Sequence, residues 1–375
     1  MTPAAGAAAA PSQHRGRDPL LVALFALFLL TPAALHILGI GQSTARDEMR
    51  DLVVRPRFPT SLGAWRALGG ELDAYLADRF GLRPALVTAA NRLSFAFRLP
   101  AGKSVIAGRD DWLYSNFYGE IDQYAGLQLL SQAQIAAWVT ALKRERDWLA
   151  ARGIKFLFVI VPDKSEIYPE HLPEGLPRGR LTPADQILAA LKRDGTIDFV
   201  DLAPVLRAAK ATGQIYYRTD NHWNPTGAYH GLAEVMRGRW PAGITLPPLA
   251  DYRIDPTPFY GPLAMFLKLQ CCIREPRNDL VRTFPDPVTA QHGLATPDAQ
   301  GAWIDTGHAQ DPSIFLIADS FSWAWFRLLP DVARRVVYRR HGQTIPTALI
   351  EKEKPAILIY ELTESYLVGP PDRLP

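Results

Sequence analysis

The chain has few of the residues that would tie it to a disulfide framework or a metal. Its 375 residues include only two cysteines, Cys271 and Cys272, and these are adjacent. An adjacent pair cannot link distant parts of the chain, so it forms either a strained vicinal disulfide or two thiols, and we favour the thiols. Further soft metal ligands are missing nearby. The cysteines therefore assign no compartment, and we expect no metal and no cofactor.

An excess of charge of one sign is also missing. The net charge is +3, and the 41 basic residues are scattered along the chain. Nucleic-acid-binding domains gather basic side chains on one face, so we expect no nucleic-acid partner. What the chain does have is 48% hydrophobic residues and 32 prolines. This composition predicts a globular protein with a sizeable core and many rigid turns.

One long hydrophobic run lies near the N-terminus. Residues 19–40, PLLVALFALFLLTPAALHILGI, are mostly apolar and long enough to cross a bilayer core of roughly 30 Å. Two arginines precede the run, and basic residues favour the cytoplasmic side of a membrane. We therefore predict a cytoplasmic tail over 1–18, a transmembrane signal anchor over 19–40 and an exported remainder. The alternative is a cleaved signal peptide with Ser43 and Ala45 at the cleavage site, which also exports the remainder.

The remainder of the chain changes its pattern near residue 100. Residues 45–100 have helical periodicity and predict a helical lead-in. Residues 101–375 alternate between apolar strand patterns and helical patterns, apart from a proline-rich, polar insertion at about 240–310. The expected strands are 155–161, 196–202, 313–319, 334–339 and 356–362, and the expected helices are 132–151, 183–193, 225–238 and 345–353. This alternation predicts an α/β fold with a mainly parallel sheet covered by helices on both faces.

Ligands of open α/β sheets bind beyond the carboxyl ends of the strands. One of these ends leads into ADSFSWAWF, where Ser320 lies between an apolar strand and an aromatic helical segment. A serine at such a turn exposes its hydroxyl, and the first N–H groups of the helix can stabilise an oxyanion. Ser320 is therefore the candidate nucleophile.

A serine nucleophile needs a base. His222 is the one histidine of the exported region with a carboxylate two residues before it, Asp220 in TDNHWNPTGAYH. In extended backbone these two side chains share a face, so Asp220 can orient an imidazole whose other nitrogen faces Ser320. Two alternatives stay open. Asp220 and Ser320 are also favoured helix N-caps, and Asp220, His222 and His230 are possible metal ligands.

Five stretches resemble the alginate O-acetyltransferase family, the AlgJ/AlgX-type SGNH-hydrolase-like proteins. YYRTDNHWNPTGAYHGLAEV resembles the family's Asp-x-His-Trp-Asn motif, and ADSFS takes the place of its nucleophile motif. SVIAGRDDWLYS, VIVPDKSEIYPEHLP and LDAYLADRFGLRPALVTAANRL resemble its Gly-x-x-x-Trp-Leu, Pro-x-Lys-x-x-Ile-Tyr-Pro and helical lead-in segments. They occur in the family's order over 45–240 and 312–368, although Ala318 stands where glycine is usual.

The resemblance implies an SGNH-hydrolase-like, flavodoxin-like three-layer sandwich with Ser320 as nucleophile, His222 as base and Asp220 as orienting residue. It implies an extracytoplasmic O-acetyltransferase that moves an acetyl group through acetyl-serine onto an alginate-like exopolysaccharide. The expected partners are the polysaccharide acceptor and a membrane-bound acyltransferase that supplies the donor. The chain ends soon after Ser320, so we expect the single-domain type, anchored in a bacterial inner membrane with its domain in the periplasm. A carbohydrate esterase or deacetylase and a non-catalytic scaffold of a polysaccharide export complex are the alternatives.

Four other residues are candidates for oxyanion or substrate binding: Lys164, Arg218, Asp319 and Tyr217. Lys164 follows the carboxyl end of a predicted strand, where it would bind an acidic substrate or shape the oxyanion site; a surface salt bridge is the competing interpretation. Arg218 is expected to pair with local carboxylates. The aromatic rings of Trp112, Trp223, Trp323 and Trp325 are candidates for stacking on sugars, although core packing is the stronger expectation.

Overall fold

The structure is a computed structural model that describes residues 18–41, 51–97, 104–293, 301–342, 344–372 and 374. It divides into two compact units, one up to Leu93 and one from Ser94 onward. The predicted cytoplasmic tail, except residue 18, and the alternative cleavage site at Ser43 and Ala45 lie outside the described residues.

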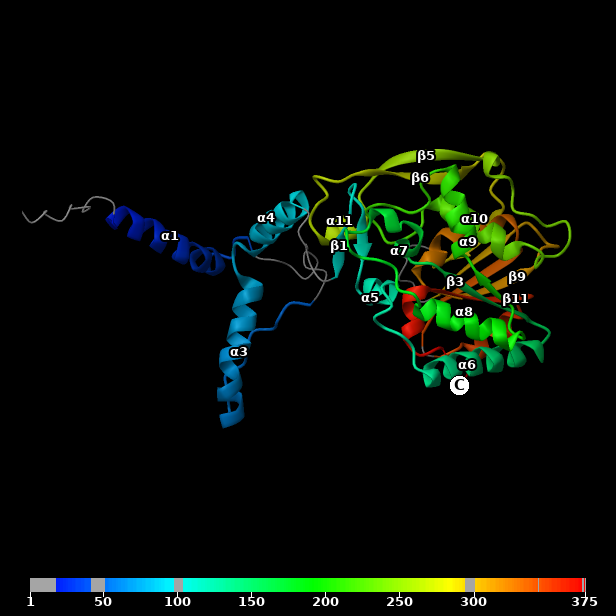
Figure 1. The fold of residues 1–375 in the computed structure, drawn as a ribbon, viewed down its shortest axis with the longest axis horizontal. Coiled ribbons are helices and arrows are strands. Elements are labelled where there is room, and N and C mark those ends of the chain that lie inside the picture. Colours follow the sequence, from blue (N-terminus) through cyan, green and yellow to red (C-terminus); the bar gives the residue numbers. More distant parts are fainter. Residues whose placement is uncertain are drawn as a thin grey trace, which may run out of the picture. The chain divides into compact units, whose positions relative to one another are not determined.

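The N-terminal unit is helical where it is described (Figure 1). Its helices are α1 (Asp18–Ile37), α3 (Leu62–Arg79) and α4 (Arg83–Ala96), the last of which runs across the boundary between the units. Within α1, Pro19–Ile37 is long and apolar enough to cross a membrane, a property that a signal sequence shares. The predicted lead-in is helical over α3 and α4.

The second unit is built on a seven-stranded sheet with the order β4-β3-β11-β9-β10-β8-β7 (Figure 1). The strands are β3 (Lys155–Val161), β4 (Phe199–Asp201), β7 (Val288–His292), β8 (Gly301–Thr306), β9 (Ser313–Ala318), β10 (Arg335–Arg340) and β11 (Ile357–Thr363). From β4 to β10 all neighbours are parallel, whereas β8 is antiparallel to β10 and β7 to β8. The predicted, mainly parallel sheet is therefore confirmed.

Helices cover both faces of this sheet. One face packs against α6 (Gln132–Ala150), α8 (Pro183–Asp194) and α12 (Thr347–Glu353), and the other packs against α9 (Ala203–Ala209) and α10 (Pro225–Met236). Successive residues of a strand point to opposite faces, so Ile314 and Leu316 of β9 enter the core under α9 and α10, and Phe315 and Ile317 enter the core under α6 and α8. The result is the predicted three-layer sandwich.

The segment at about 240–310, which the sequence marks as an insertion, contains strands of the main sheet. It supplies β7 and β8, and it forms a separate hairpin of β5 (Tyr252–Phe259) and β6 (Glu275–Arg282). The sequence does not predict β5, because Pro256 and Pro258 interrupt its strand pattern. A strand in a two-stranded sheet tolerates proline, because half of its N–H groups point away from the partner strand.

Short elements complete the second unit. They are the hairpin of β1 (Val105–Ala107) and β2 (Leu113–Ser115), the helices α5 (Glu120–Tyr124), α7 (Lys164–Ile167) and α11 (Pro262–Phe266), and the 3-10 helices η1 (Pro169–His171), η2 (Lys210–Thr212), η3 (Leu249–Asp251), η4 (Ser320–Arg327), η5 (Leu329–Asp331) and η6 (Glu364–Val368). Two of them, α7 and η4, start directly beyond the carboxyl ends of β3 and β9.

Candidate active site

Three side chains from two distant segments form a continuous hydrogen-bonded chain. The Nε2 atom of His222 lies 2.8 Å from the Oγ atom of Ser320, although the two residues are 98 positions apart. The Nδ1 atom of His222 lies 2.7 Å from Oδ1 of Asp220. Because a carboxylate can only accept, Nδ1 carries the proton and Nε2 accepts from the serine hydroxyl. This is the arrangement in which a histidine acts as base for a serine nucleophile.

A tight loop holds Asp220 and His222 in place. Tyr216 and Trp223 form an antiparallel bridge, and the N–H of Tyr217 donates to the carbonyl oxygen of His222 at 3.1 Å. Directly afterwards, Asn224 caps α10, since its side chain accepts from the N–H of Gly227. The alternative in which Asp220 caps this helix is therefore wrong.

Ser320 is the first residue of η4 and follows β9. Its neighbour Asp319 is the N-cap, so the alternative in which Ser320 is the cap is also wrong. The buried Asp319 carboxylate accepts from the N–H of Phe321 at 2.8 Å and from the N–H of Thr363 at 2.8 Å. These bonds tie the turn that contains Ser320 to the end of β11, and they occupy a carboxylate that the sequence marks as a substrate-binding candidate.

The two segments are joined by more than the triad. The indole N–H of Trp223 donates to the carbonyl oxygen of Phe321 at 2.9 Å. The ring of His222 lies 4.7 Å from the ring of Phe321, measured between centroids. Because these contacts come from His222 itself and from the residues next to His222 and Ser320, they hold these two side chains in register.

Opposing effects act on the pKa of His222 and on that of Asp220. Burial lowers the pKa of His222, but the charge and the hydrogen bond of Asp220 raise it above its ordinary value. Burial raises the pKa of Asp220, but the charge and hydrogen bonds of His222 bring it below its ordinary value. Asp220 thus stays ionised, and its negative charge stabilises the protonated form of His222.

Lys164 and Arg218 do not face the triad's cavities. Lys164 is 3% exposed, and its Nζ atom donates to the carbonyl oxygens of Tyr217, Arg218 and Asp220. A surface salt bridge is therefore the wrong interpretation, and the three N–H groups are already used, which leaves none for an oxyanion. The guanidinium of Arg218 donates to the carbonyl oxygen of Arg274 at 3.0 Å.

Two cavities meet at the triad and share Ser320, His222 and Phe321. The first, of about 340 Å³, is mainly apolar. It is lined by Tyr217, Asp220, His222, Trp223, Pro225, Phe259, Pro262, Arg277, Asp279, Leu280, Ser320, Phe321, Trp323, Ala324, Arg327 and Leu328. The second, of about 450 Å³, is more polar and is lined by Ser115, Phe117, Tyr118, Glu120, Asn221, His222, Ser320, Phe321, Arg340, Thr363, Ser365 and Tyr366.

Of the candidates for ligand contact, the structure places Tyr217 and Trp323 at the first cavity, whereas Trp112 and Trp325 are buried in the core. Trp223 is buried as well, at 2% exposure, although it is one of the residues that line the first cavity. Sequence reasoning misses the cavity residues of β5 and β6, because no motif marks them. Asn221, which lines the second cavity, lies inside the motif TDNHWN, so the sequence could have identified it as a candidate.

No group of three histidine, cysteine, aspartate or glutamate side chains in the described part of the chain is placed to hold a metal. Asp220, His222 and His230 thus do not form the alternative metal site. Both cysteines are exposed thiols.

Comparisons with known proteins agree with this fold and these motifs. Residues 105–335 match the family model described as SGNH hydrolase-like domain, acetyltransferase AlgX. The probable alginate O-acetylase AlgJ of Pseudomonas syringae pv. tomato is 28% identical over 316 residues, which cover 79% of this chain and 77% of that protein. The probable alginate O-acetylase AlgJ of Pseudomonas aeruginosa is 29% identical over 291 residues, 70% of each chain.

Solved structures support the fold alone. Bacillus cereus PatB1 with a sulfonyl adduct matches with a TM-score of 0.53 at 16% identity, over 71% of this chain and 95% of that one. A DHHW family protein from Eubacterium siraeum matches with a TM-score of 0.50 at 16% identity, over 61% and 86% of the two chains. Since the family model spans well over half of the sequence, the chain belongs to the AlgX-type acetyltransferase family of SGNH-hydrolase-like domains, as its motifs predicted.

Proposed function

We propose that this chain is an extracytoplasmic O-acetyltransferase in which Ser320 is the nucleophile, His222 the base and Asp220 the orienting residue. The observation that carries the proposal is the hydrogen-bonded chain from Asp220 through His222 to Ser320, with distances of 2.7 and 2.8 Å, at the meeting point of two cavities. Membership of the AlgX-type family and the similarity to probable alginate O-acetylases support acetyl transfer as the reaction.

In the first step Ser320 Oγ attacks the carbonyl carbon of an acetyl donor while His222 Nε2 takes the hydroxyl proton. The tetrahedral intermediate collapses when the bond to the leaving group breaks, and His222 returns the proton to that group. Acetyl-serine remains. The oxyanion requires N–H donors, for which the backbone N–H of Ser320 and the side chain of Asn221, in the same cavity, are our candidates.

In the second step a sugar hydroxyl attacks the acetyl-serine. His222 takes the proton of this hydroxyl, the ester bond to Ser320 Oγ breaks, and Ser320 recovers its proton from His222. We propose an alginate-like exopolysaccharide as the acceptor, after the names of the AlgJ relatives. Two cavities that both reach Ser320 give room for a donor and a long acceptor, which favours transfer over hydrolysis by an esterase.

We further propose that α1 anchors the protein in a bacterial inner membrane, with the catalytic unit in the periplasm. The apolar stretch Pro19–Ile37 supports the anchor. Acetyl-CoA is cytoplasmic, so a membrane-bound acyltransferase partner would have to supply the acetyl donor. An intact hydrogen-bonded triad argues against the scaffold alternative, because a scaffold does not require it.

The test uses the full-length protein in detergent with a chromogenic acetyl ester, with and without alginate oligomers. We expect Ser320→Ala to reduce acetate release by about 10³-fold or more, and the wild type to transfer acetyl to the sugar, detected by mass spectrometry. Ser322→Ala is the matched control from the same motif, and it should keep activity within about tenfold. Hydrolysis that depends on Ser320 without sugar acetylation would select the esterase. Equal activity in wild type and Ser320→Ala would refute the assignment.

A further inference from the structure

The loop that carries the base has an unusual polar environment. We call residues 217–222 the catalytic loop; it contains Asp220 and His222, and Tyr217, Thr219 and Asp220 are all less than a tenth exposed. Its peptide groups belong to no regular helix or sheet. Buried peptide groups without partners are costly, so partners must come from elsewhere.

A buried lysine supplies partners for the carbonyl groups. The Nζ atom of Lys164 donates to the carbonyl oxygens of Tyr217 at 3.0 Å, Arg218 at 3.1 Å and Asp220 at 2.6 Å. Three carbonyl oxygens therefore converge on one ammonium group. Hydrogen bonds from a charged donor are shorter and stronger than neutral ones, so this contact specifies the path of the loop tightly.

A buried glutamate supplies partners for the N–H groups. Glu275 is 4% exposed, and its carboxylate accepts from the N–H of Arg218 at 2.8 Å and of Thr219 at 2.7 Å. It also accepts from the hydroxyl of Thr219 and from the side chain of Gln214. Lys164 and Glu275 thus hold the carbonyl and N–H sides of the same few peptides, and we call the two residues the Lys164–Glu275 clamp.

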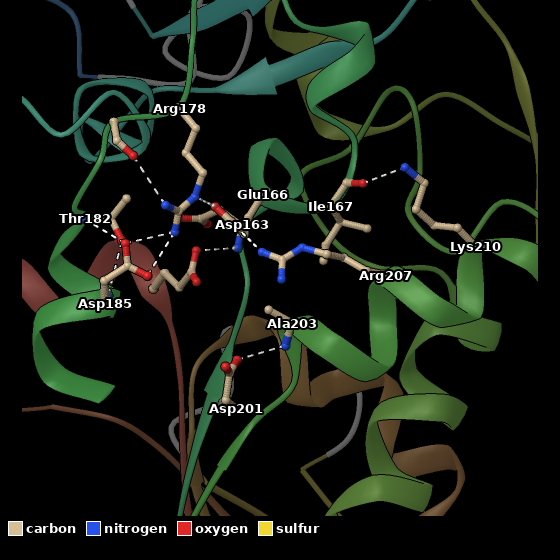
Figure 2. Close-up of polar contacts among 12 residues, drawn as sticks. Asp163, Glu166, Ile167, Arg178, Thr182, Asp185, Asp201, Ala203, Arg207 and Lys210 are labelled. Carbon is tan, nitrogen blue, oxygen red and sulfur yellow. Dashed lines mark hydrogen bonds and ion pairs between the residues drawn. The ribbon is translucent and has the colours of Figure 1, made fainter. Parts of the chain in front are cut away.

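The turn that carries Lys164 is held by the hydrogen bonds and ion pairs of its neighbours, and Figure 2 shows those of Glu166 and Ile167. Lys164 is the first residue of α7, and two residues later Glu166 pairs with both Arg178 and Arg207. The carbonyl oxygen at the end of α7, that of Ile167, accepts from Lys210 at 2.8 Å. These bonds connect α7 to the loop before α8, to α9 and to the start of η2, so the position of the ammonium group is set by the main sandwich.

The glutamate half comes from the segment at about 240–310. Glu275 is the first residue of β6, and the nearby start of α11 adds further bonds, since the N–H groups of Leu263 and Ala264 donate to the carbonyl oxygen of Thr219. Gly261 lies so close that a Cβ atom there would be 2.4 Å from the same oxygen. The segment thus packs its backbone directly on the catalytic loop.

We propose that Lys164 and Glu275 are positioning residues that aim Asp220 and His222 at Ser320. The proposal rests on the proposed function, which assigns His222 its role. Neither clamp residue lines either of the two cavities, so both act through the loop and not on the substrate. Loss of the clamp should therefore lower kcat and leave KM nearly unchanged. A displacement of about 1 Å in a catalytic group is enough to cost about a hundredfold in rate.

The charge of Lys164 should also affect the pKa of His222, which gives a second way to test the clamp. Asp220 and Asp319 raise the pKa of His222, whereas burial and the positive charge of Lys164 lower it. Burial lowers the pKa of Lys164 itself to about 7, against the opposing effect of Asp220 and Glu275. Removal of the ammonium group should thus raise the pKa of His222, an effect that a purely packing role would not produce.

The experiment compares Lys164→Met, Lys164→Arg and Glu275→Gln in the full-length protein, with Lys143→Met as control because Lys143 pairs with Asp194 on α6 and α8, remote from the loop. We expect Lys164→Met to lower kcat by about 10- to 100-fold with KM within about threefold. The acid limb of its pH profile should move up by about half a pH unit or more. Lys164→Arg keeps the charge but not the tetrahedral donor geometry, so kcat should fall while the acid limb stays in place.

Two outcomes would overturn the clamp: a folded Lys164→Met with wild-type kcat, or an acid limb that does not move. If Lys164→Met does not fold, Glu275→Gln decides, and it must lower kcat at least about tenfold at similar KM. NMR titration tests the clamp without turnover when it compares the pKa of His222 in Ser320→Ala and in the double variant Lys164→Met Ser320→Ala. A higher His222 pKa in the double variant, together with a wild type that is inactive on acetyl esters, would retain the clamp and reject the proposed function.

Discussion

The fold shifts the pKa values of two buried carboxylates in opposite directions. These are Asp220 in the catalytic loop and Glu145 in α6. Asp220 is 7% exposed and Glu145 is 2% exposed. Asp220 has His222 and Lys164 beside it, and its pKa lies below the ordinary value. Glu145 faces the core under the sheet, neither of its oxygens has a partner in the described part of the chain, and burial followed by repulsion from Asp372 raises its pKa to about 9.

The difference shows that burial alone does not decide whether a carboxylate is charged. At the site, opposite charges and hydrogen bonds outweigh the loss of water, and the carboxylate stays ionised. In α6 nothing compensates for the loss of water, so Glu145 is protonated at neutral pH. Glu361 of β11 resembles Glu145: both of its oxygens lack a partner in the described residues, and burial and then Asp319 raise its pKa well above the ordinary value.

Asp220→Asn is expected to have the largest effect, because it removes the charge that distinguishes the two environments. A carboxamide cannot stabilise the imidazolium, and it permits the wrong tautomer of His222, so kcat should fall by about 10²- to 10⁴-fold. The pKa of His222 should fall as well, since the charge and the hydrogen bond of Asp220 raise it more than Asp319 does. Steady-state kinetics and NMR titration check both parts. Near-wild-type kcat would mean that Asp220 is no more functional than Glu145.

The pH dependence of the wild type also tests whether Asp220 and His222 form a charged pair. A base must be neutral, so activity should rise with pH through the raised pKa of His222. Stability should change in the opposite direction. Because the folded pKa of His222 exceeds the unfolded one, its part of the stability of the Asp220–His222 pair is lost as the pH rises from about 6.5 through the folded value. The lowered pKa of Asp220 sets the acid limit, since the contribution is lost as the pH falls from about 4 through the folded value of Asp220.

Glu145→Gln is expected to have an intermediate effect, on stability alone. Since the pKa is about 9 in the folded chain and about 4.5 in the unfolded one, the free energy of unfolding of the wild type should fall as the pH rises between these values. The slope reaches about 1.4 kcal/mol per pH unit. Glutamine removes this contribution, so the variant should be more stable by about 1–3 kcal/mol at pH 8.

Denaturant unfolding at several pH values measures this difference, and kcat should stay unchanged as an internal control. An identical pH slope in the wild type and in Glu145→Gln would show that Glu145 is ionised in the folded protein, and the contrast with Asp220 would be lost.

Glu361→Gln is expected to have the smallest effect. At neutral pH the glutamine replaces a carboxyl group that is already uncharged and of nearly the same shape, so stability should change by less than about 1 kcal/mol. The position is close to Asp319, the neighbour of the nucleophile, which makes kcat the more informative measurement. A hundredfold or larger loss of kcat in a folded Glu361→Gln would show that Glu361, like Asp220 and unlike Glu145, contributes to activity.

Local sequence was sufficient for the sheet's parallel part and for the choice of triad residues. The apolar runs at 313–319 and 356–362 correspond to β9 (Ser313–Ala318) and β11 (Ile357–Thr363), because strands buried on both faces need continuous apolar residues. Ser320 at a strand-to-helix turn and the Asp220–His222 spacing are also local features. The structure brings these three side chains within hydrogen-bonding distance, whereas their catalytic roles remain our proposal.

Only the tertiary structure decided what surrounds them. The antiparallel strands β8 and β7 extend one side of the sheet and are of mixed composition, so their pairing, β8 with β10 and β7 with β8, does not follow from their own pattern. Lys164 was expected near a ligand and is instead enclosed by three carbonyl groups, and Glu275 belongs to no motif. Both belong to segments distant in sequence from the loop that they hold. The partners of a buried charge are chosen by the folded chain, because partners from distant segments meet only when the core assembles.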